Sequence, residues 1–267
     1  MDVLKVPVLV YHAIDVVPLA GLERWTTPPP EFEQHLEVIA ASGRVPLTIS
    51  ELADCLRGER RLERDAVAVT FDDGYADTHD AVLELLQRNV SSTVYVTTGT
   101  IGSPGMLSAA QLEQLAGLDG VEVGAHSVTH PHLDELSGAR LDEEVAGSKR
   151  ALESLLGAPV ASFAYPHGSH DRRSRAAVVR AGYDSAAAVK NAISHLEDDP
   201  FAIARWTVTA GTPAQRLAGV LRGEEVPVAW SRERMRTRGY RAARRSRRWL
   251  REAGRRDRRG DERAGAP

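Results

Sequence analysis

Residues suited to catalysis follow four short apolar runs in this chain of 267 residues. Asp72 and Asp73 come directly after "AVAVTF", and His12 comes directly after "VPVLVY". His126 and His130 follow "VEVGA", and the run "ASF" leads into "AYPHG". In an α/β barrel, catalytic side chains stand at the carboxyl ends of the strands. If the four runs are strands, we expect these side chains to meet at one end of a barrel; the alternative is polar strand ends scattered over the surface.

His126 and His130 have a spacing that suits a metal site. On one helical turn, residues four apart share a face with Cβ atoms about 5–6 Å apart, and two imidazoles can then bind one ion at about 2.0–2.1 Å. One carboxylate from a neighbouring strand completes a His₂Asp set that leaves positions open for water and substrate. The only cysteine is Cys55, which excludes a Cys-based zinc site. We therefore predict a catalytic zinc site, with another divalent metal as the alternative.

Asp72 and Asp73 are adjacent carboxylates, which repel each other. A cation resolves the conflict when one aspartate binds it and the other stays free to accept a proton from water. A plain β-turn or a helix cap is the alternative interpretation of an Asp-Asp-Gly sequence taken by itself.

Strands and helices alternate in the pattern that must position these residues. Runs rich in β-branched residues predict strands near 7–12, 66–71, 93–98, 121–126, 161–166, 185–189 and 204–209. The clearest amphipathic helix spans 139–156, and another follows the "TTPPP" run. This pattern predicts an α/β fold, a distorted (β/α) barrel of about seven strands. An open doubly wound sheet is the alternative, but neither G-x-G-x-x-G nor a P-loop follows any of the strands.

Three motifs, "TFDDGYAD", "HSVTH" and "FAYPHG", resemble those of the polysaccharide deacetylase family, also called the NodB homology domain or carbohydrate esterase family 4. The opening "PVLVYHAI" and the segment "GAHSVTHPHL" are most similar to the branch that de-N-acetylates poly-N-acetylglucosamine. The resemblance runs from about residue 7 to residue 210 and implies the same distorted barrel.

The resemblance implies roles for the strand-end residues. Asp72 corresponds to the catalytic base of the family. Asp73, His126 and His130 correspond to its metal ligands. In the poly-N-acetylglucosamine branch, the general acid corresponds to His12.

The third motif implies an oxyanion stabiliser, the backbone N–H of His167. Substrate binding is assigned to the residues around it, Tyr165, Pro166 and Gly168. Core packing explains the Tyr165 side chain equally well.

One position departs from the family pattern. Many members have an arginine in the third motif that orients the base, and this chain has Ala164 there. The family's late Asp-Trp and Leu-x-His motifs have only loose candidates in Asp184, Arg205 and Trp206. The sequence therefore leaves open what orients Asp72.

The charge is distributed unevenly along the chain. Residues 231–267 hold 15 arginines and 5 acidic residues, a net charge of +10, whereas the first 230 residues hold 19 basic and 32 acidic residues, a net charge of −13. We expect a catalytic domain over 1–225 and an Arg-rich tail over 226–267, either helical or disordered. A helical tail would place its apolar residues opposite most arginines, which suits an anionic membrane surface. Nucleic acid is not expected as a partner, because the acidic domain would oppose it.

The N-terminus reads as a first strand, without the basic region and cleavage site of an export signal. No stretch approaches the roughly 20 apolar residues that cross a bilayer. The expected localisation is the cytoplasm, at the inner membrane face if the tail binds there.

Together these patterns predict a metal-dependent hydrolase that removes N-acetyl groups from N-acetylated sugars and releases acetate. The expected substrates resemble poly- or oligo-N-acetylglucosamine or are lipid-linked glycans. Two alternatives remain: a metal-dependent amidase or esterase acting on a small biosynthetic intermediate, and a non-catalytic family member that binds glycans.

Overall fold

The computed structural model describes residues 4–18, 20–224 and 226–230. Residues 231–267 lie outside this range, so the prediction of a tail that is helical or disordered and binds a membrane surface stays a prediction. Among the described residues, no helix has the length and apolar character needed to cross a bilayer.

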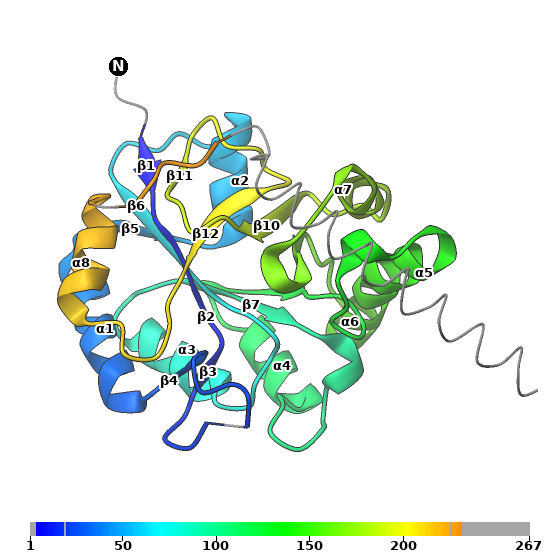
Figure 1. Ribbon diagram of the computed structural model, residues 1–267, viewed down its shortest axis with the longest axis horizontal. Coiled ribbons are helices and arrows are strands. Elements are labelled where there is room, and N and C mark those ends of the chain that lie inside the picture. The colour runs from blue at the N-terminus through cyan, green and yellow to red at the C-terminus, as the bar shows by residue number, and fades with distance from the viewer. Residues whose placement is uncertain (1–3, 19, 225, 231–267) are drawn as a thin grey trace, which may run out of the picture. The chain divides into compact units, whose positions relative to one another are not determined.

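Seven parallel strands form a closed barrel (Figure 1). They follow one another around the barrel in the order β2, β12, β10, β9, β8, β7 and β6, and β6 closes the ring by pairing with β2. Their bounds are Val8–Tyr11 for β2, Ala66–Phe71 for β6, Ser92–Val96 for β7, Val121–Ala125 for β8, Ser162–Ala164 for β9, Ser185–Val189 for β10 and Ile203–Thr207 for β12. Each coincides with a predicted strand, and the distorted barrel is confirmed.

The distortion is at the seam between β8 and β9. Strands β7 and β8 pair over five residues, whereas β8 and β9 pair at Ala125 and Phe163. Shorter strands lie around the barrel: β5 (Val45–Leu47) beside β6, β1 (Lys5–Val6) with β11 (Ser194–His195), and β3 (Ala13–Ile14) with β4 (Thr26–Thr27).

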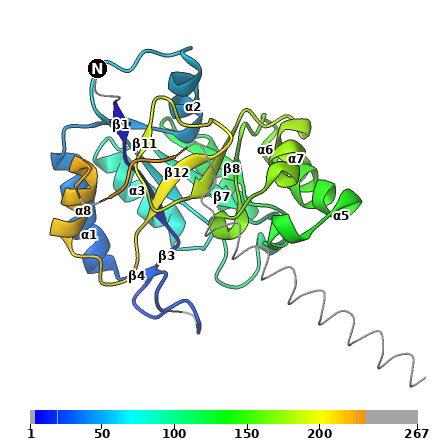
Figure 2. The same ribbon diagram turned by 45° about the horizontal axis from the view of Figure 1, so that its top comes forward.

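Helices cover the outside of the barrel. They are α1 (Pro29–Ala41), α2 (Ile49–Arg57), α3 (Thr78–Gln87), α4 (Ala109–Ala116), α5 (Gly138–Asp142), α6 (Ser148–Leu156), α7 (Arg172–Arg180) and α8 (Ala214–Arg222). Figures 1 and 2 show α1 and α8 side by side on one side of the barrel and α5, α6 and α7 on the other. The predicted helix over 139–156 is interrupted, because the π-helical segment Glu143–Gly147 separates α5 from α6.

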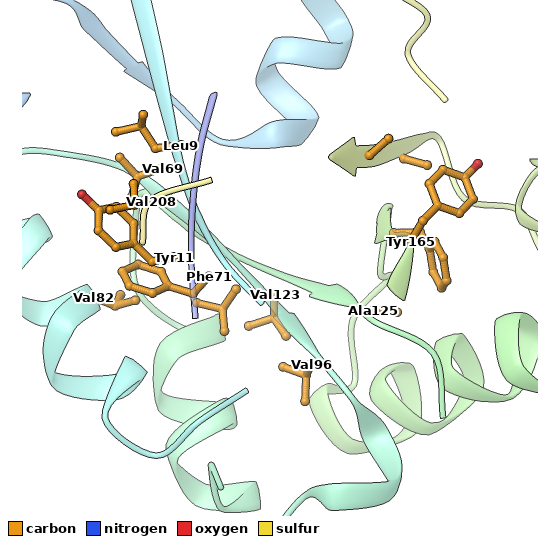
Figure 3. Packing of buried hydrophobic residues seen from close by; sticks show 14 of the residues in the cluster. Leu9, Tyr11, Val69, Phe71, Val82, Val96, Val123, Ala125, Tyr165 and Val208 are labelled. Carbon is orange, nitrogen blue, oxygen red and sulfur yellow. The ribbon is translucent and has the colours of Figure 1, made fainter. Parts of the chain in front are cut away.

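The outward-facing strand residues form most of the apolar core beneath these helices. Leu9, Tyr11, Val69 and Phe71 of β2 and β6 are buried together with Val82 of α3 (Figure 3). Successive side chains of a strand point to opposite faces, so each barrel strand contributes one set of side chains to this outer core and another to the barrel interior. Burial of an apolar side chain of this size contributes about 1.5–3 kcal/mol.

The barrel interior is lined largely by small residues, which leave room for the side chains of Tyr95 and Arg205. At Gly124, an added Cβ would lie 2.6 Å from the Tyr95 ring. The Tyr95 hydroxyl pairs with the Ser162 hydroxyl at 2.6 Å, and the Arg205 guanidinium lies 5.4 Å from the centre of the Tyr95 ring. A charged side chain inside a barrel needs a partner of opposite charge.

Residues after α8 return to the barrel. Val226 is buried, and Val228 forms a parallel bridge with Ile193. The backbone N–H of Ala229 donates to the carbonyl of Ile193 at 2.8 Å. The compact unit that contains the barrel accordingly runs to Ala229.

Candidate active site

The sequence-predicted site residues gather at the carboxyl ends of the barrel strands. Asp72 and Asp73 follow β6, His126 follows β8, and His12 follows β2. His167 lies in the 3-10 turn Pro166–Gly168 after β9. The barrel thus brings together residues that are more than a hundred positions apart in the chain.

Asp73, His126 and His130 form a set with the geometry of a metal site. The Nε2 atoms of His126 and His130 lie 3.5 and 3.2 Å from Asp73 Oδ1, and one ligand atom from each residue lies within 4.8 Å of the others. Two ligand atoms that are each about 2.1 Å from one ion, at a tetrahedral angle, are about 3.4 Å apart. Asp73 Oδ1 is also buried without a hydrogen-bond partner among the described residues. These residues therefore fit a divalent ion.

His126 is oriented for this role by the strand beside it. Its Nδ1 lies 2.9 Å from the carbonyl oxygen of Ala164 and donates a hydrogen bond to it, which leaves the Nε2 lone pair facing Asp73. A hydrogen bond of this kind fixes the tautomer of a metal-binding histidine. Burial lowers the pKa of His126 to about 3, so the imidazole is neutral, as a ligand must be.

The two histidines do not share a helical turn, as their spacing suggested. Residues 126–130, here called the metal loop, are not helical, and Ser127 and His130 have positive φ values of 65° and 57°. Ser127 Oγ accepts a hydrogen bond from the His130 N–H at 3.0 Å. The left-handed residues and this hydrogen bond bring the second imidazole to the first, with ring centres 4.9 Å apart.

Asp72 is held by Arg205, a residue that sequence reasoning left as a loose candidate for another motif. The guanidinium binds both carboxylate oxygens, at 2.6 Å from Oδ1 and 2.7 Å from Oδ2, and the two side chains are almost completely buried. Arg205 Nη1 also donates to Thr70 Oγ1 at 3.1 Å. Successive side chains of β12 point alternately to the outside and the inside of the barrel, and Arg205 points to the inside. This alternation was the feature of the sequence that could have identified Arg205.

The surroundings of the two adjacent carboxylates shift their pKa values in opposite directions. Burial favours protonation of Asp72, but the charge and the hydrogen bonds of Arg205 outweigh burial and hold its pKa at about 2. Burial raises the pKa of Asp73 to about 6, and the charge of Asp72 adds to this effect. Asp72 is therefore ionised without a bound cation, whereas a cation would most strongly favour the ionised form of Asp73.

His12 lies next to both carboxylates. Its Nδ1 is buried and has no hydrogen-bond partner within the described ranges, and its ring centre lies 5.3 Å from that of Trp25. A charge on His12 would oppose the effect of burial on the pKa values of Asp72 and Asp73, as expected for an imidazole close to both carboxylates. The sequence did not indicate that Trp25 lies beside His12.

The turn after β9 lies beside the metal loop. The His130 and His167 rings have centres 4.4 Å apart, and His167 has a φ of 58°. Gly168 has a φ of 65°, and a Cβ there would lie 2.3 Å from Val189 Cβ. Only glycine lets the turn lie this close to β10, which keeps the His167 backbone near the metal residues.

Tyr165 does not fit the predicted role in substrate binding. Its side chain is fully buried in the outer core, and its hydroxyl donates to the carbonyl oxygen of Phe201 at 3.0 Å (Figure 3). Pro166 is buried as well. A strand places alternate side chains on opposite faces, so Tyr165 faces the helices and contributes packing.

His132, another histidine near the site, is not part of the metal set. Its ring lies against that of His167, with centres 3.8 Å apart.

Comparisons with known proteins agree with this geometry. The polysaccharide deacetylase family model matches residues 59–186, which include the paired aspartates, the metal loop and the turn after β9. This part of the chain belongs to the polysaccharide deacetylase family. It is therefore among the carbohydrate deacetylases, a class of hydrolases.

Individual relatives extend the comparison. The Bacillus subtilis protein YxkH is 25% identical over 208 residues, covering 78% of this chain and 72% of that protein. The chitooligosaccharide deacetylase of Azorhizobium caulinodans is 25% identical over 108 residues, covering 40% of this chain and 50% of that protein. Among solved structures, the Streptococcus pyogenes deacetylase PplD in complex with acetate has a TM-score of 0.75 at 24% identity, covering 84% of this chain and all (100%) of that one.

The family match leaves out two parts of the site. His12 precedes residue 59 and Arg205 follows residue 186, so both lie beyond the matched range. The strands that carry them, β2 and β12, are neighbours in the barrel.

Proposed function

We propose that the protein is a metal-dependent deacetylase that hydrolyses the N-acetyl groups of sugars and releases acetate. The observation that carries the proposal is the set Asp73, His126 and His130 beside an ionised, arginine-bound Asp72. The substrate proposed is a poly- or oligo-N-acetylglucosamine-like glycan or a lipid-linked glycan. Its support is the name of the chitooligosaccharide deacetylase among the relatives.

Asp73, His126 and His130 would hold the ion, for which zinc is our proposal because two imidazoles and one carboxylate suit it. When bound, a divalent ion supplies a Lewis acid that polarises the amide carbonyl and makes a water molecule more acidic.

Asp72 is the proposed general base. Its pKa of about 2 keeps the carboxylate ionised at neutral pH, so it can accept a proton from the attacking water. Arg205 binds both oxygens and fixes the plane of the carboxylate. This contact answers the question that Ala164 raised, since the orienting arginine comes from β12.

His12 and the turn after β9 complete the proposed reaction. His12 Nδ1 is buried and unpartnered within the described residues, and a protonated imidazole there can donate to the departing amine nitrogen. The proposal assigns the oxyanion to the backbone N–H of His167, because the left-handed turn lies next to His130.

Acetate release from N-acetylglucosamine oligomers tests the proposal. The zinc-loaded protein should release acetate, and the same protein treated with a chelator should not. The control is a variant with the outer surface changed, Arg150→Gln, which leaves the site untouched. Acetate release that survives complete removal of metal contradicts metal-dependent deacetylation, and binding of the oligomers without release indicates the non-catalytic alternative.

A further inference from the structure

We infer that Glu144 is a positioning residue for the metal loop, residues 126–130, and so for the metal ligand His130. The inference rests on the proposed function, because it concerns the ion that this loop would help to bind. Glu144 touches neither the metal set nor the predicted catalytic residues by hydrogen bond or ion pair in the described part of the chain.

The Glu144 carboxylate binds the middle of the metal loop. Its Oε2 accepts hydrogen bonds from the backbone N–H groups of Val128 and Thr129, at 3.0 and 2.8 Å. Its Oε1 accepts a third from the Thr129 hydroxyl at 2.5 Å. Glu144 is 8% exposed, so these contacts replace most of the hydration of its carboxylate.

The shape of the loop explains why a carboxylate is needed there. Ser127 has a left-handed backbone, and the next two N–H groups point to the same side. Successive N–H groups in such a turn form a concave site that attracts an anion. Without Glu144 these two groups would lose their partners while partly buried, and the positive φ values at both ends of the turn would lose their support.

Glu144 lies in the π-helical segment that packs beside the metal loop. This segment, Glu143–Gly147, lies between α5 and α6. π-Helical turns are rare in proteins, and many of those that occur are at functional sites. Its Gly147 approaches the loop so closely that a Cβ would lie 3.3 Å from Val128 Cγ2. The preceding residue, Glu143, is exposed to solvent and forms an ion pair with Arg150.

The opposite side of the loop is fixed by the turn after β7. The N–H groups of Thr98 and Gly99 donate to the carbonyls of Ser127 and Val128, at 3.1 and 2.8 Å. Those bonds restrain the carbonyl side, and Glu144 restrains the N–H side. Together they define the direction of the chain as it reaches His130.

The test is the zinc affinity of Glu144→Gln, measured by competition with a chelator. An amide keeps the size of the side chain but offers one accepting oxygen to three donors, so the loop loses its hold. We expect zinc affinity to fall about 10- to 100-fold, the usual effect of losing a group that orients a metal ligand. Glu143→Gln is the matched control, because it removes the neighbouring charge at an exposed side chain, and its zinc affinity should equal that of the wild type.

Two further measurements separate positioning from folding. The visible absorption of the cobalt-loaded protein reports ligand geometry, and it should change in Glu144→Gln and stay unchanged in Glu143→Gln. If Glu144→Gln does not fold, Thr129→Ala removes one of the three hydrogen bonds at an exposed residue and should lower zinc affinity by a smaller factor.

A folded Glu144→Gln variant with wild-type zinc affinity and cobalt spectrum overturns this inference. So does a folded Thr129→Ala variant whose zinc affinity is unchanged, where that variant has to be used. A wild-type protein that binds no zinc contradicts the proposed function instead, so the two failures are distinguishable.

Discussion

At the scale of single residues, the site depends on the different surroundings of Asp72 and Asp73. Arg205 neutralises the first, and the proposed ion would neutralise the second. Residue types and spacing predicted that the two aspartates meet His126 and His130 at one end of the barrel, and the structure places these four side chains together there. Residue types and spacing did not identify Arg205 as the partner of Asp72, because the two residues are separated by 133 positions and only the closed barrel brings them together.

Asp72→Asn should separate catalysis from metal binding. The amide cannot accept a proton from water, so we expect kcat to fall about 10²- to 10⁴-fold, the usual contribution of a general base. Zinc content, measured by elemental analysis, should stay at the wild-type level because Asp72 is outside the metal set. Asp73→Ala is the control that should lose the metal. A fully active Asp72→Asn protein would rule out the role of the base.

Arg205→Met should destabilise the protein strongly. Removal of the guanidinium leaves Asp72 as a buried, unpaired charge, and we expect a loss of about 3–5 kcal/mol in the free energy of unfolding, measured with urea. The loss should be smaller than additive in the double variant with Asp72→Asn, because both changes remove the same contact.

The pH dependence of this loss has a definite sign. The pKa of Asp72 falls from 3.8 to about 2 on folding, so the stabilisation is present above 3.8 and disappears as the pH falls through 2. The difference between wild type and Arg205→Met should therefore shrink over that range. A difference that stays constant would contradict the ion pair.

At the scale of secondary-structure elements, the apolar pattern predicted the seven strands but not the interruptions that shape the site. The stripe over 139–156 has helical spacing throughout, and nothing in it distinguishes a π-helical turn from a continuous helix. Likewise, a spacing of four between histidines suits a helix, and the left-handed residues of the metal loop override it. Both departures depend on contacts between loop and helix that are distant in the sequence.

Gly124→Ala tests how β8 and the barrel interior fit together. Its Cβ would lie 2.6 Å from Cε1 of Tyr95, so the ring beneath Arg205 must shift. We expect a loss of about 1–3 kcal/mol in the free energy of unfolding, as for other overpacked cores. Gly117→Ala at the end of α4, where the nearest atom to an added Cβ is 3.5 Å away, is the control and should unfold near the wild-type urea concentration. Equal stability of the two variants would show that the interior has room to spare.

At the scale of the whole molecule, closure of the barrel assembles the site from both ends of the catalytic unit. β2 pairs with β12 and with β6, so Arg205 on β12 lies beside the strands that lead into His12 and the paired aspartates. The sequence predicted a barrel from the number of strands, but it did not predict which strands are neighbours across the closure. This neighbourhood explains how an arginine on β12 replaces one expected on β9.

Zinc should stabilise the whole fold more at about pH 7.5 than at about pH 5. The pKa of Asp73 is raised from 3.8 to about 6, so in the metal-free protein its contribution to stability is present below 3.8 and is lost as the pH rises through 6. Burial lowers the pKa of His126 to about 3, so that ligand is already neutral at the lower pH, and burial also lowers the pKa of His130 from its usual value. The measurement is the change in Tm on adding zinc at each pH.

Asp73→Asn is the control for this comparison. The change in Tm on adding zinc to this variant should be the same at both pH values. An equal shift for the wild type at both pH values would contradict the assignment of Asp73 as the titrating ligand.

Anomalous diffraction from a zinc-loaded crystal would locate the ion relative to Asp73, His126 and His130. We expect one strong zinc peak bound by Asp73 Oδ1 and by Nε2 of His126 and His130, at about 2.0–2.2 Å from each atom. Asp72 should remain bound to Arg205 and outside the coordination sphere. A crystal saturated with zinc that shows no peak there, or a peak bound by other side chains, would contradict the proposed metal site.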